Sequence, residues 1–324
     1  MSETLHTQKT TSYPWLAYAI KRLISGVIAI WFIATATFFG MHLIPGDPLS
    51  SEKKMSPQIR KNLEARYGLD KPLLTQYGIF LKNIAKGDFG ISFTQENRRV
   101  NDIIREHFPI SALLGVLALI FATLGGIFLG AFAATHKNQL SDHVIMLMVI
   151  LVVSVPGFVF AALSQLGIMK INDAFNTDFP IAGFSSLSHL VVPSIVLGLG
   201  TLAYLTRLMR SSLLDIESAD YIRTAKAKGL SNAQIFAKHK LRNALLPVVT
   251  VLGPAVAGIT TGGFVVEMIF AIPGLGKYFV EAVQQLDYTV IMGTAVFYGG
   301  FLVLTVILVD ILYGWVDPRI QVVK

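Results

Sequence analysis

The 324-residue sequence contains no cysteine, so the chain can form neither disulfide bonds nor a thiol site. Charged residues are also scarce, at 15% of the chain against about 25% in an average soluble domain. Hydrophobic residues make up 53%, and the mean hydropathy is +0.60. The apolar runs are about 20 residues long and do not alternate, which favours membrane-spanning helices over barrel strands. The composition therefore predicts a polytopic, all-α membrane protein.

The sequence also lacks the signatures of an enzyme or an ATP-binding protein. It contains no G-x-x-x-x-G-K-[ST] phosphate loop, no H-E-x-x-H zinc motif and no G-x-S-x-G nucleophile motif. No cluster of carboxylates occurs in its apolar runs. We therefore expect a non-catalytic chain that holds no metal or cofactor itself, and we assign the lone His42 a structural role.

Six apolar runs predict six transmembrane helices, at residues 22–44, 110–135, 143–169, 190–208, 244–272 and 289–313. Most Lys and Arg residues fall on one side of the membrane if both termini are cytoplasmic, which explains the net charge of +7 without nucleic-acid binding. Residues 1–21 and 314–324 are then cytoplasmic tails, and 45–109 is an outer loop. The core, 110–313, contains a cytoplasmic loop at 209–243. No cleavable signal peptide is expected, so the first run stays as a span.

The outer loop is too long and too regularly patterned to be a simple linker. Its proline and glycine positions predict three short amphipathic helices. These helices begin at Ser56, Pro72 and Asn101 and end at Gly68, Gly87 and Pro109. The loop is either a docking surface for an extracellular partner or a cap that shields the ends of the spans, and its residues leave both interpretations open.

The cytoplasmic loop carries the most informative pattern in the chain. Asp220–Lys228 contains no helix breaker and precedes Gly229, which predicts a short helix ended by a glycine cap. Ser231 and Gln234 have the S-x-x-Q spacing of a capping box, which predicts a second helix leading into the fifth span. One face of the first helix has small side chains and suits insertion into a groove of another protein. The alternative is an interfacial helix held on lipid by Lys and Arg.

The string DYIRTAKAKGLS, followed by HKLRNALLP, resembles the EAA loop of ABC importer permeases, in the form found in the peptide and nickel branch (the DppB/OppB type). Arg223 and Thr224 stand where the general motif has Glu and Ala, a departure that this branch shares. Further segments resemble the same branch, in order, along nearly the whole chain: IPGDP, GLDKPLLTQY, KGDFGISF, IFAIPGLGKYFVEAV, DYTVIMG and DILYGWVDPRI. Each segment alone is weak, but their order and spacing together are specific.

The resemblance implies a type I ABC importer permease fold, with six transmembrane helices and a cytoplasmic coupling helix, in the bacterial cytoplasmic membrane. The implied partners are a second homologous permease, forming a heterodimer, two cytoplasmic ATPase subunits that bind ATP and Mg²⁺, and an extracellular solute-binding protein that delivers peptides. A binding protein favours the docking interpretation of the outer loop. The residues implied in ATPase coupling are Tyr221, Ile222, Arg223, Thr224, Ala225, Lys226, Ala227, Lys228 and Gly229.

Two alternative functions follow from the same residues. Nickel, glutathione or another small solute is an alternative substrate for the same machinery. A secondary transporter is the alternative from another class, but it predicts charged residues at mid-span positions, and these are nearly absent.

The fifth span is the predicted pathway helix, because its Pro, Gly and Thr residues are tolerated where neighbours or water satisfy the backbone. The predicted pathway and gate residues are Thr250, Thr260, Thr261, Glu267, Pro273, Gly274 and Gly276. Close helix packing is the alternative explanation for the small residues. Glu267 either pairs with Lys277 or with a basic group of a partner to close an outer gate, or lies among lipid headgroups. Ser154–Gly157 is expected to kink the third span, and Gly126 and Gly130 to pack against another helix.

Overall fold

The structure, a computed structural model, describes residues 14–44, 64–65, 68–95, 97–261 and 263–316. Side chains are described in these ranges except at 14–19, 257, 260–261 and 310–316. The regular structure of the described part is helical, apart from one bridge between Ile91 and Arg99. The helices are α1 (Pro14–Leu43), α3 (Leu73–Ala85), α4 (Val100–Thr135), α5 (Leu140–Ser154), α6 (Gly157–Phe175), α7 (Ser188–Glu217), α8 (Asp220–Ala227), α9 (Asn232–Ile235), the π-helix η1 (Phe236–Leu241), α10 (Arg242–Thr261), α11 (Phe264–Ile269), α12 (Leu275–Gln284) and α13 (Tyr288–Val316).

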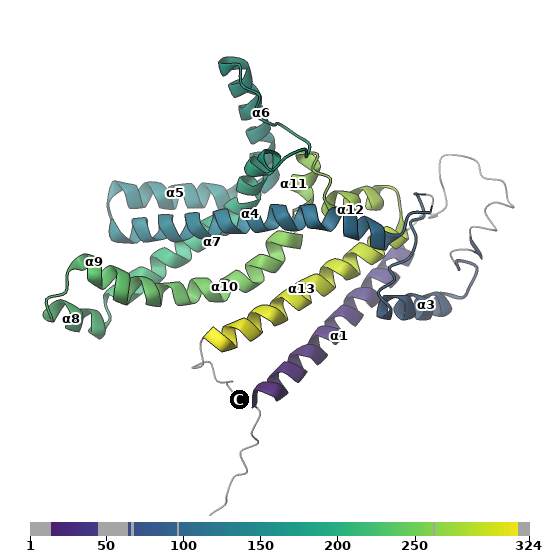
Figure 1. The fold of residues 1–324 in the computed structure, drawn as a ribbon, viewed down its shortest axis with the longest axis horizontal. Helices are drawn as coiled ribbons and strands as arrows, with labels where there is room; N and C mark the ends of the chain where they lie inside the picture. Colours follow the sequence, from purple (N-terminus) through teal and green to yellow (C-terminus); the bar gives the residue numbers. More distant parts are fainter. Residues whose placement is uncertain (1–13, 45–63, 66–67, 96, 262, 317–324) are drawn as a thin grey trace, which may run out of the picture.

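The long helices form two groups that run along the molecule (Figure 1). One group is α4, α5 and α7, and the other is α1 and α13, while α10 contacts α4, α7 and α13. The short helices α8 and α9 lie at one end, and α3 and α12 lie at the opposite end (Figure 1). We call these the α8 end and the α12 end. Helix α6 projects from the body beside α11 (Figure 1).

Glycines bring α4 and α7 into close contact. A Cβ atom on Gly126 would lie 2.7 Å from Leu205 Cβ, and one on Gly130 would lie 2.5 Å from the Thr206 carbonyl oxygen. From the other side, a Cβ atom on Gly198 would lie 2.7 Å from the Ala118 carbonyl oxygen. Small residues allow helix backbones to approach in this way. The expectation that Gly126 and Gly130 pack against another helix is confirmed.

The third and fifth of the six predicted spans are divided in the structure. Four described helical segments are long and apolar enough to cross a membrane, or up to five if the bent pair α5–α6 is one span. That pair turns by 106° at residues 155–156. Val155 is extended, with ψ 128°, because the ring of Pro156 disfavours a helical residue before it. The predicted kink in the third span is therefore confirmed, and it is a full break.

The fifth predicted span, 244–272, also divides. α10 ends at Thr261 and the short helix α11 begins at Phe264. Glycine has a low helix propensity, and a Gly-Gly pair stands at residues 262–263 between the two helices. Pro247 and Pro254, by contrast, lie inside α10 without ending it.

The outer loop agrees with the sequence in part. The predicted second helix is α3, which follows Pro72 and ends before Gly87 in a left-handed turn with φ +74°. The predicted first helix lies mostly outside the described residues. The predicted third helix is not separate, because α4 runs from Val100 through Pro109 to Thr135. Phe108 packs against two rings of α13, with centroids 4.8 Å from Phe297 and 4.9 Å from Phe301, and this packing favours the continued helix.

Candidate functional site

The short helix α8 presents most of its surface to the outside at the α8 end (Figure 1). Only Ile222 and Ala225 turn inward, where they pack with Ile235 of α9 in a small apolar cluster. The other predicted coupling residues are exposed: Tyr221, Arg223, Thr224, Lys226, Ala227, Lys228 and Gly229. The structure therefore divides the predicted set into two residues that are buried against this chain and seven that are exposed on its surface.

The turn after α8 has the predicted glycine conformation and helix cap. Gly229 has φ +78°, a left-handed conformation that L side chains rarely adopt. Apart from its two chain neighbours, no atom of the described residues lies within 4 Å of the position a Cβ atom would take at Gly229, so the space above this turn is open. Ser231 caps α9 by accepting from the Gln234 backbone N–H, and the Gln234 side chain accepts from the Ser231 N–H at 3.0 Å. The predicted capping box is confirmed.

A carboxylate at the end of α7 holds α8 in place. Glu217 accepts from Lys226 Nζ of α8 at 3.0 Å and also pairs with Lys240 of η1. Lys226 is therefore engaged within the chain, whereas Arg223 makes a loose contact, 3.9 Å, with Asp220. Glu217 was not predicted as a functional residue, since its partners lie 9 and 23 residues away along the chain.

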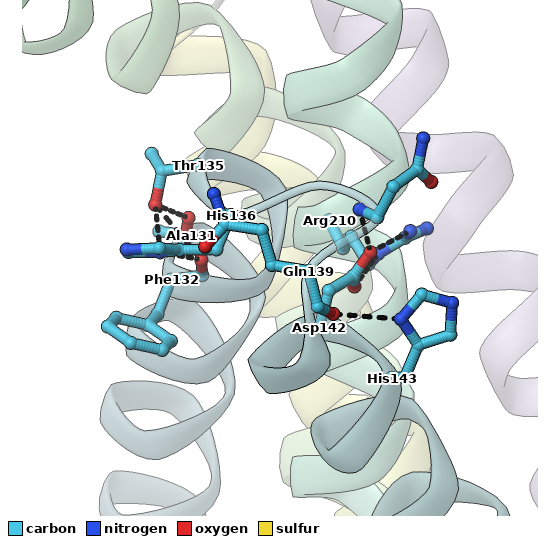
Figure 2. A network of polar contacts seen from close by, with 9 residues as sticks. Ala131, Phe132, Thr135, His136, Gln139, Asp142, His143 and Arg210 are labelled. Carbon is cyan, nitrogen blue, oxygen red and sulfur yellow. Dashed lines mark hydrogen bonds and ion pairs between the residues drawn. The ribbon is translucent and has the colours of Figure 1, made fainter.

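The same end of the molecule contains an ion pair between a buried carboxylate and a partly buried guanidinium (Figure 2). The guanidinium of Arg210 in α7 donates to both carboxylate oxygens of Asp142 in α5, at 2.6 and 2.7 Å. The Asn138 backbone N–H donates to the same carboxylate at 3.0 Å. Asp142 is 2% exposed. This pair fixes the α4–α5 turn to α7, one to two helical turns from Glu217 along α7.

At the α12 end, the carboxylate of Glu267 lies inside a turn that wraps around it. Glu267 is 1% exposed, and its Oε2 accepts from the Lys277 backbone N–H at 3.0 Å. The Gly276 N–H and the Ser111 hydroxyl also hydrogen-bond to this carboxylate. A Cβ atom on Gly274 would lie 2.4 Å from Glu267 Oε2, so only glycine leaves room for the carboxylate there. The glycines of this turn therefore allow its backbone to approach the Glu267 carboxylate closely.

A second buried carboxylate, Asp287, lies between α12 and α13. It accepts from the Val290 N–H at 3.2 Å, which caps the start of α13. It also accepts from the Phe93 N–H at 3.1 Å, from the Thr94 N–H at 3.2 Å and from the hydroxyls of Thr94 and Ser92. Asp287 is 1% exposed. It therefore joins the outer loop to the α12–α13 turn.

The remaining predicted pathway residues are described to different extents. Thr250 is exposed on α10 and donates to the Pro247 carbonyl at 2.5 Å. Thr260 and Thr261 end α10, and their side chains lie outside the described part. The Pro273 carbonyl is 2.9 Å from His107 Nδ1 of α4. The structure thus brings Glu267 and the 273–276 turn together, while Thr250 lies apart from them on α10.

The metal prediction was that this chain holds no metal. Among the described residues, no group of three or more His, Asp or Glu side chains could hold a metal ion. The ring of His42 is 2.8 Å, at Nδ1, from the Phe38 carbonyl oxygen, and its centroid is 4.3 Å from that of the Phe38 ring. These contacts are those of a structural histidine.

Comparison with protein families gives two matches that together cover most of the chain. Residues 126–322 match the family described as "Binding-protein-dependent transport system inner membrane component". Residues 15–115 match the family described as the N-terminal part of a binding-protein-dependent transport system membrane component. The first match includes α7 to α12, and hence both the α8 surface and the Glu267 turn.

Individual relatives agree with this result. The chain is 46% identical to the dipeptide transport system permease protein DppB of Bacillus subtilis, over 95% of this chain and 98% of that protein. It is 38% identical to the oligopeptide transport system permease protein OppB of Haemophilus influenzae, over 94% of this chain and 99% of that protein. A chain of the solved inward-facing MetNI methionine ABC transporter matches with a TM-score of 0.50 at 15% identity, covering 68% of this chain and 97% of that one. That likeness concerns the fold alone.

Proposed function

Because this chain belongs to the family of binding-protein-dependent transport system inner membrane components, we propose that it forms half of the transmembrane pathway of an ABC importer for dipeptides or oligopeptides. The observation that carries the proposal is the 46% identity to a dipeptide permease over 95% of the chain. The protein is a non-catalytic, multi-pass subunit of the inner membrane. Two separate ATPase subunits bind ATP and Mg²⁺ and supply the hydrolysis.

The exposed face of α8 is the proposed contact with an ATPase groove. Its position at the tip of the molecule and its open surface support this role, since seven of the predicted coupling residues face outward. Ile222 and Ala225 act from beneath, by holding α8 on α9. Lys226 serves the same purpose through Glu217, which leaves Arg223 and Lys228 as the basic residues able to select the ATPase.

This role sets the orientation of the chain. With α8 in the cytoplasm, both termini are cytoplasmic and the α12 end faces outward, in agreement with the positive-inside bias of the sequence. The outer loop then faces the extracellular solute-binding protein that delivers the peptide. A second homologous permease completes the pathway as a heterodimer in the bilayer.

The proposed mouth of the pathway is the turn at Pro273–Gly276 together with Glu267. Lys277 contributes its backbone N–H to Glu267, while its ammonium lies 3.7 Å from Glu281, so the expected Glu267–Lys277 charge pair is replaced by a backbone contact. Thr250 and the end of α10, with Thr260 and Thr261, form the proposed polar lining further inside.

The proposal is tested in proteoliposomes that contain this chain, its partner permease, the two ATPases and the solute-binding protein. Uptake of labelled dipeptide and of a longer peptide should require ATP hydrolysis and the binding protein. Nickel and glutathione are the parallel arms that test the alternative substrates. Peptide uptake driven by an ion gradient without ATPases would instead support a secondary transporter and overturn the proposal.

A further inference from the structure

We infer that α12 is a rigid link between the outer loop and the mouth of the pathway, held at its two ends by the buried carboxylates of Glu267 and Asp287. Through this link, a binding protein docked on the outer loop acts on the turn at Pro273–Gly276. The inference rests on the proposed function and assigns its positioning residues.

The first end of the link is held through α4. Helix α12 begins at Leu275, whose N–H donates to Ser111 Oγ of α4 at 2.9 Å. The next two N–H groups, of Gly276 and Lys277, hydrogen-bond to the carboxylate of Glu267. The first N–H groups of a helix have no partner within the helix and carry a partial positive charge, so a carboxylate is stabilising there. The start of α12 is thus fixed to α4 and α11 together.

The second end is held through the outer loop. Asp287 follows α12 and stands at the start of α13, where the helix dipole favours its charge. Its donors from the outer loop come from three consecutive residues, Ser92, Phe93 and Thr94. A residue next to that segment packs on the same turn, because a Cβ atom on Gly90 would lie 2.6 Å from Thr289 Cγ2. A displacement of this part of the loop therefore moves the end of α12.

Neither carboxylate has a cation as a partner among the described residues. A buried charge is expensive unless hydrogen bonds satisfy it, and removal of those bonds exposes the full desolvation penalty. Glu267 and Asp287 therefore oppose any motion that pulls α12 away from its partners. The body of α12 resists as well, since Leu275 and Ala282 pack in one core cluster with Ile103 of α4 and Ile291 of α13.

The direct test compares Asp287→Asn with Asp88→Asn in the complete complex. Asp88 is the matched control, because it lies in the same loop and, among the described residues, accepts from the nearby Gly90 N–H alone, at 3.0 Å. We expect Asp287→Asn to assemble with the wild-type yield and to keep its basal ATPase rate within about twofold. Stimulation of the ATPase by the peptide-loaded binding protein should fall at least tenfold, while Asp88→Asn stays within about twofold of wild type. Full stimulation of assembled Asp287→Asn overturns the link.

A second variant tests the other end and remains informative if Asp287→Asn does not assemble. A Cβ atom on Gly274 would lie 2.6 Å from Ser111 Oγ, which is within reach of a disulfide between cysteines at 111 and 274. The chain has no other cysteine to compete. Glu267→Ala removes the carboxylate that a side chain at 274 would meet, and it should reduce stimulation of the ATPase by the binding protein. When Ser111→Cys and Gly274→Cys are added to this variant, oxidation should restore the stimulation. Reduction of the disulfide should abolish it again.

The outcomes of this redox test separate the alternatives. An oxidised, bridged protein that is inactive would show that the start of α12 must detach during transport, which contradicts a rigid link. Equal activity of the oxidised and reduced forms would show that the connection is irrelevant. Wild-type complex in the same preparation reports on the proposed function: if the binding protein does not stimulate it, the proposed function fails and the link with it. If the binding protein stimulates the wild type, an inactive bridged protein overturns the link but leaves the proposed function standing. Equal activity of the oxidised and reduced forms does the same.

Discussion

Replacement of Gly229 tests why the turn after α8 needs glycine: for its left-handed backbone conformation, or for the close approach of an ATPase. Gly229 has φ +78°, and in this region an L residue costs about 1–2 kcal/mol while glycine costs nothing and asparagine little. The space around the missing Cβ is open within the chain. Within this chain alone, Gly229→Ala therefore costs only the free energy of placing an L residue in the left-handed backbone conformation. Gly229→Asn is the matched control, because asparagine tolerates that conformation.

The two roles predict different series of variants. If conformation is the only requirement, the cost of about 1–2 kcal/mol lowers the population of the correct turn roughly five- to thirtyfold in Gly229→Ala, whereas Gly229→Asn stays within about twofold of wild type. If an ATPase closes over the turn, every side chain interferes, so Gly229→Asn, Gly229→Ala and Gly229→Val all lose coupling, in order of increasing bulk. We expect the second pattern.

The assay is the number of peptides taken up per ATP hydrolysed in proteoliposomes. In the variants the ATPases should hydrolyse ATP at nearly the wild-type rate, because they bind nucleotide without this chain's residues, while uptake falls. Binding of the ATPases to the permease pair, measured by co-purification, separates weak assembly from poor coupling. Unchanged coupling in Gly229→Val would refute the assignment of this turn to the ATPase contact.

Three further predictions concern the connections behind α8. Arg210→Gln leaves Asp142 buried without its cation and should destabilise the protein by about 3 kcal/mol in a reversible detergent unfolding assay, with Asp142→Asn added to Arg210→Gln recovering part of the loss. Gly130→Ala places a methyl group 2.5 Å from a carbonyl oxygen of α7 and should cost about 1–3 kcal/mol in the same assay, whereas Gly167→Ala, with nothing within 4 Å, should be neutral or slightly stabilising. Glu217→Gln releases two lysines from an exposed carboxylate, so uptake per ATP should fall only a few-fold; no change would show that α8 is held by its apolar contacts alone.

The sequence predicted best those features whose partners are close along the chain. The helix before Gly229 and the capping box of Ser231 and Gln234 depend on residues within one turn, and the structure has both. The break at Pro156 follows in the same way from the proline ring. The prediction that a helix ends at Pro109 was wrong, because packing against distant residues continues α4 through this proline.

The contacts that sequence reasoning missed join distant segments. Ser111 and Leu275 are 164 residues apart, Asp142 and Arg210 are 68 apart, and Asp287 and Ser92 are 195 apart. The periodicity of hydrophobic residues along the chain does not indicate which distant residues pair. Two partial indications were present: Arg210 comes directly after the predicted fourth span, 190–208, and an aspartate directly before a helix suits an N-cap. Both indications identify a residue that needs a partner without naming the partner.

Helix α4 is the element that reaches both ends of the molecule. It has 36 residues and is therefore about 54 Å long. Its Gly130 packs on α7 near the α8 end, and its Ser111 bonds to the start of α12. Pro109 lies beyond Ser111, at the α12 end, so no proline interrupts the helix between these two contacts. A movement of α8, passed to α7 through Glu217, therefore reaches the mouth of the pathway if α4 and α7 move as one body.

This last step can be measured, because the absence of other cysteines allows site-specific spin labels. Leu124 of α4 and Tyr204 of α7 are 66% and 43% exposed, so labels there disturb no core contact. In the assembled transporter, the distance between labels at these two positions should be the same with and without ATP in an ATPase-deficient complex. A control pair that joins Tyr204 to a site on the partner permease should change. A shift in the α4–α7 distance beyond the spread of the labels would show that the two helices slide, and that the signal reaches α12 by another route.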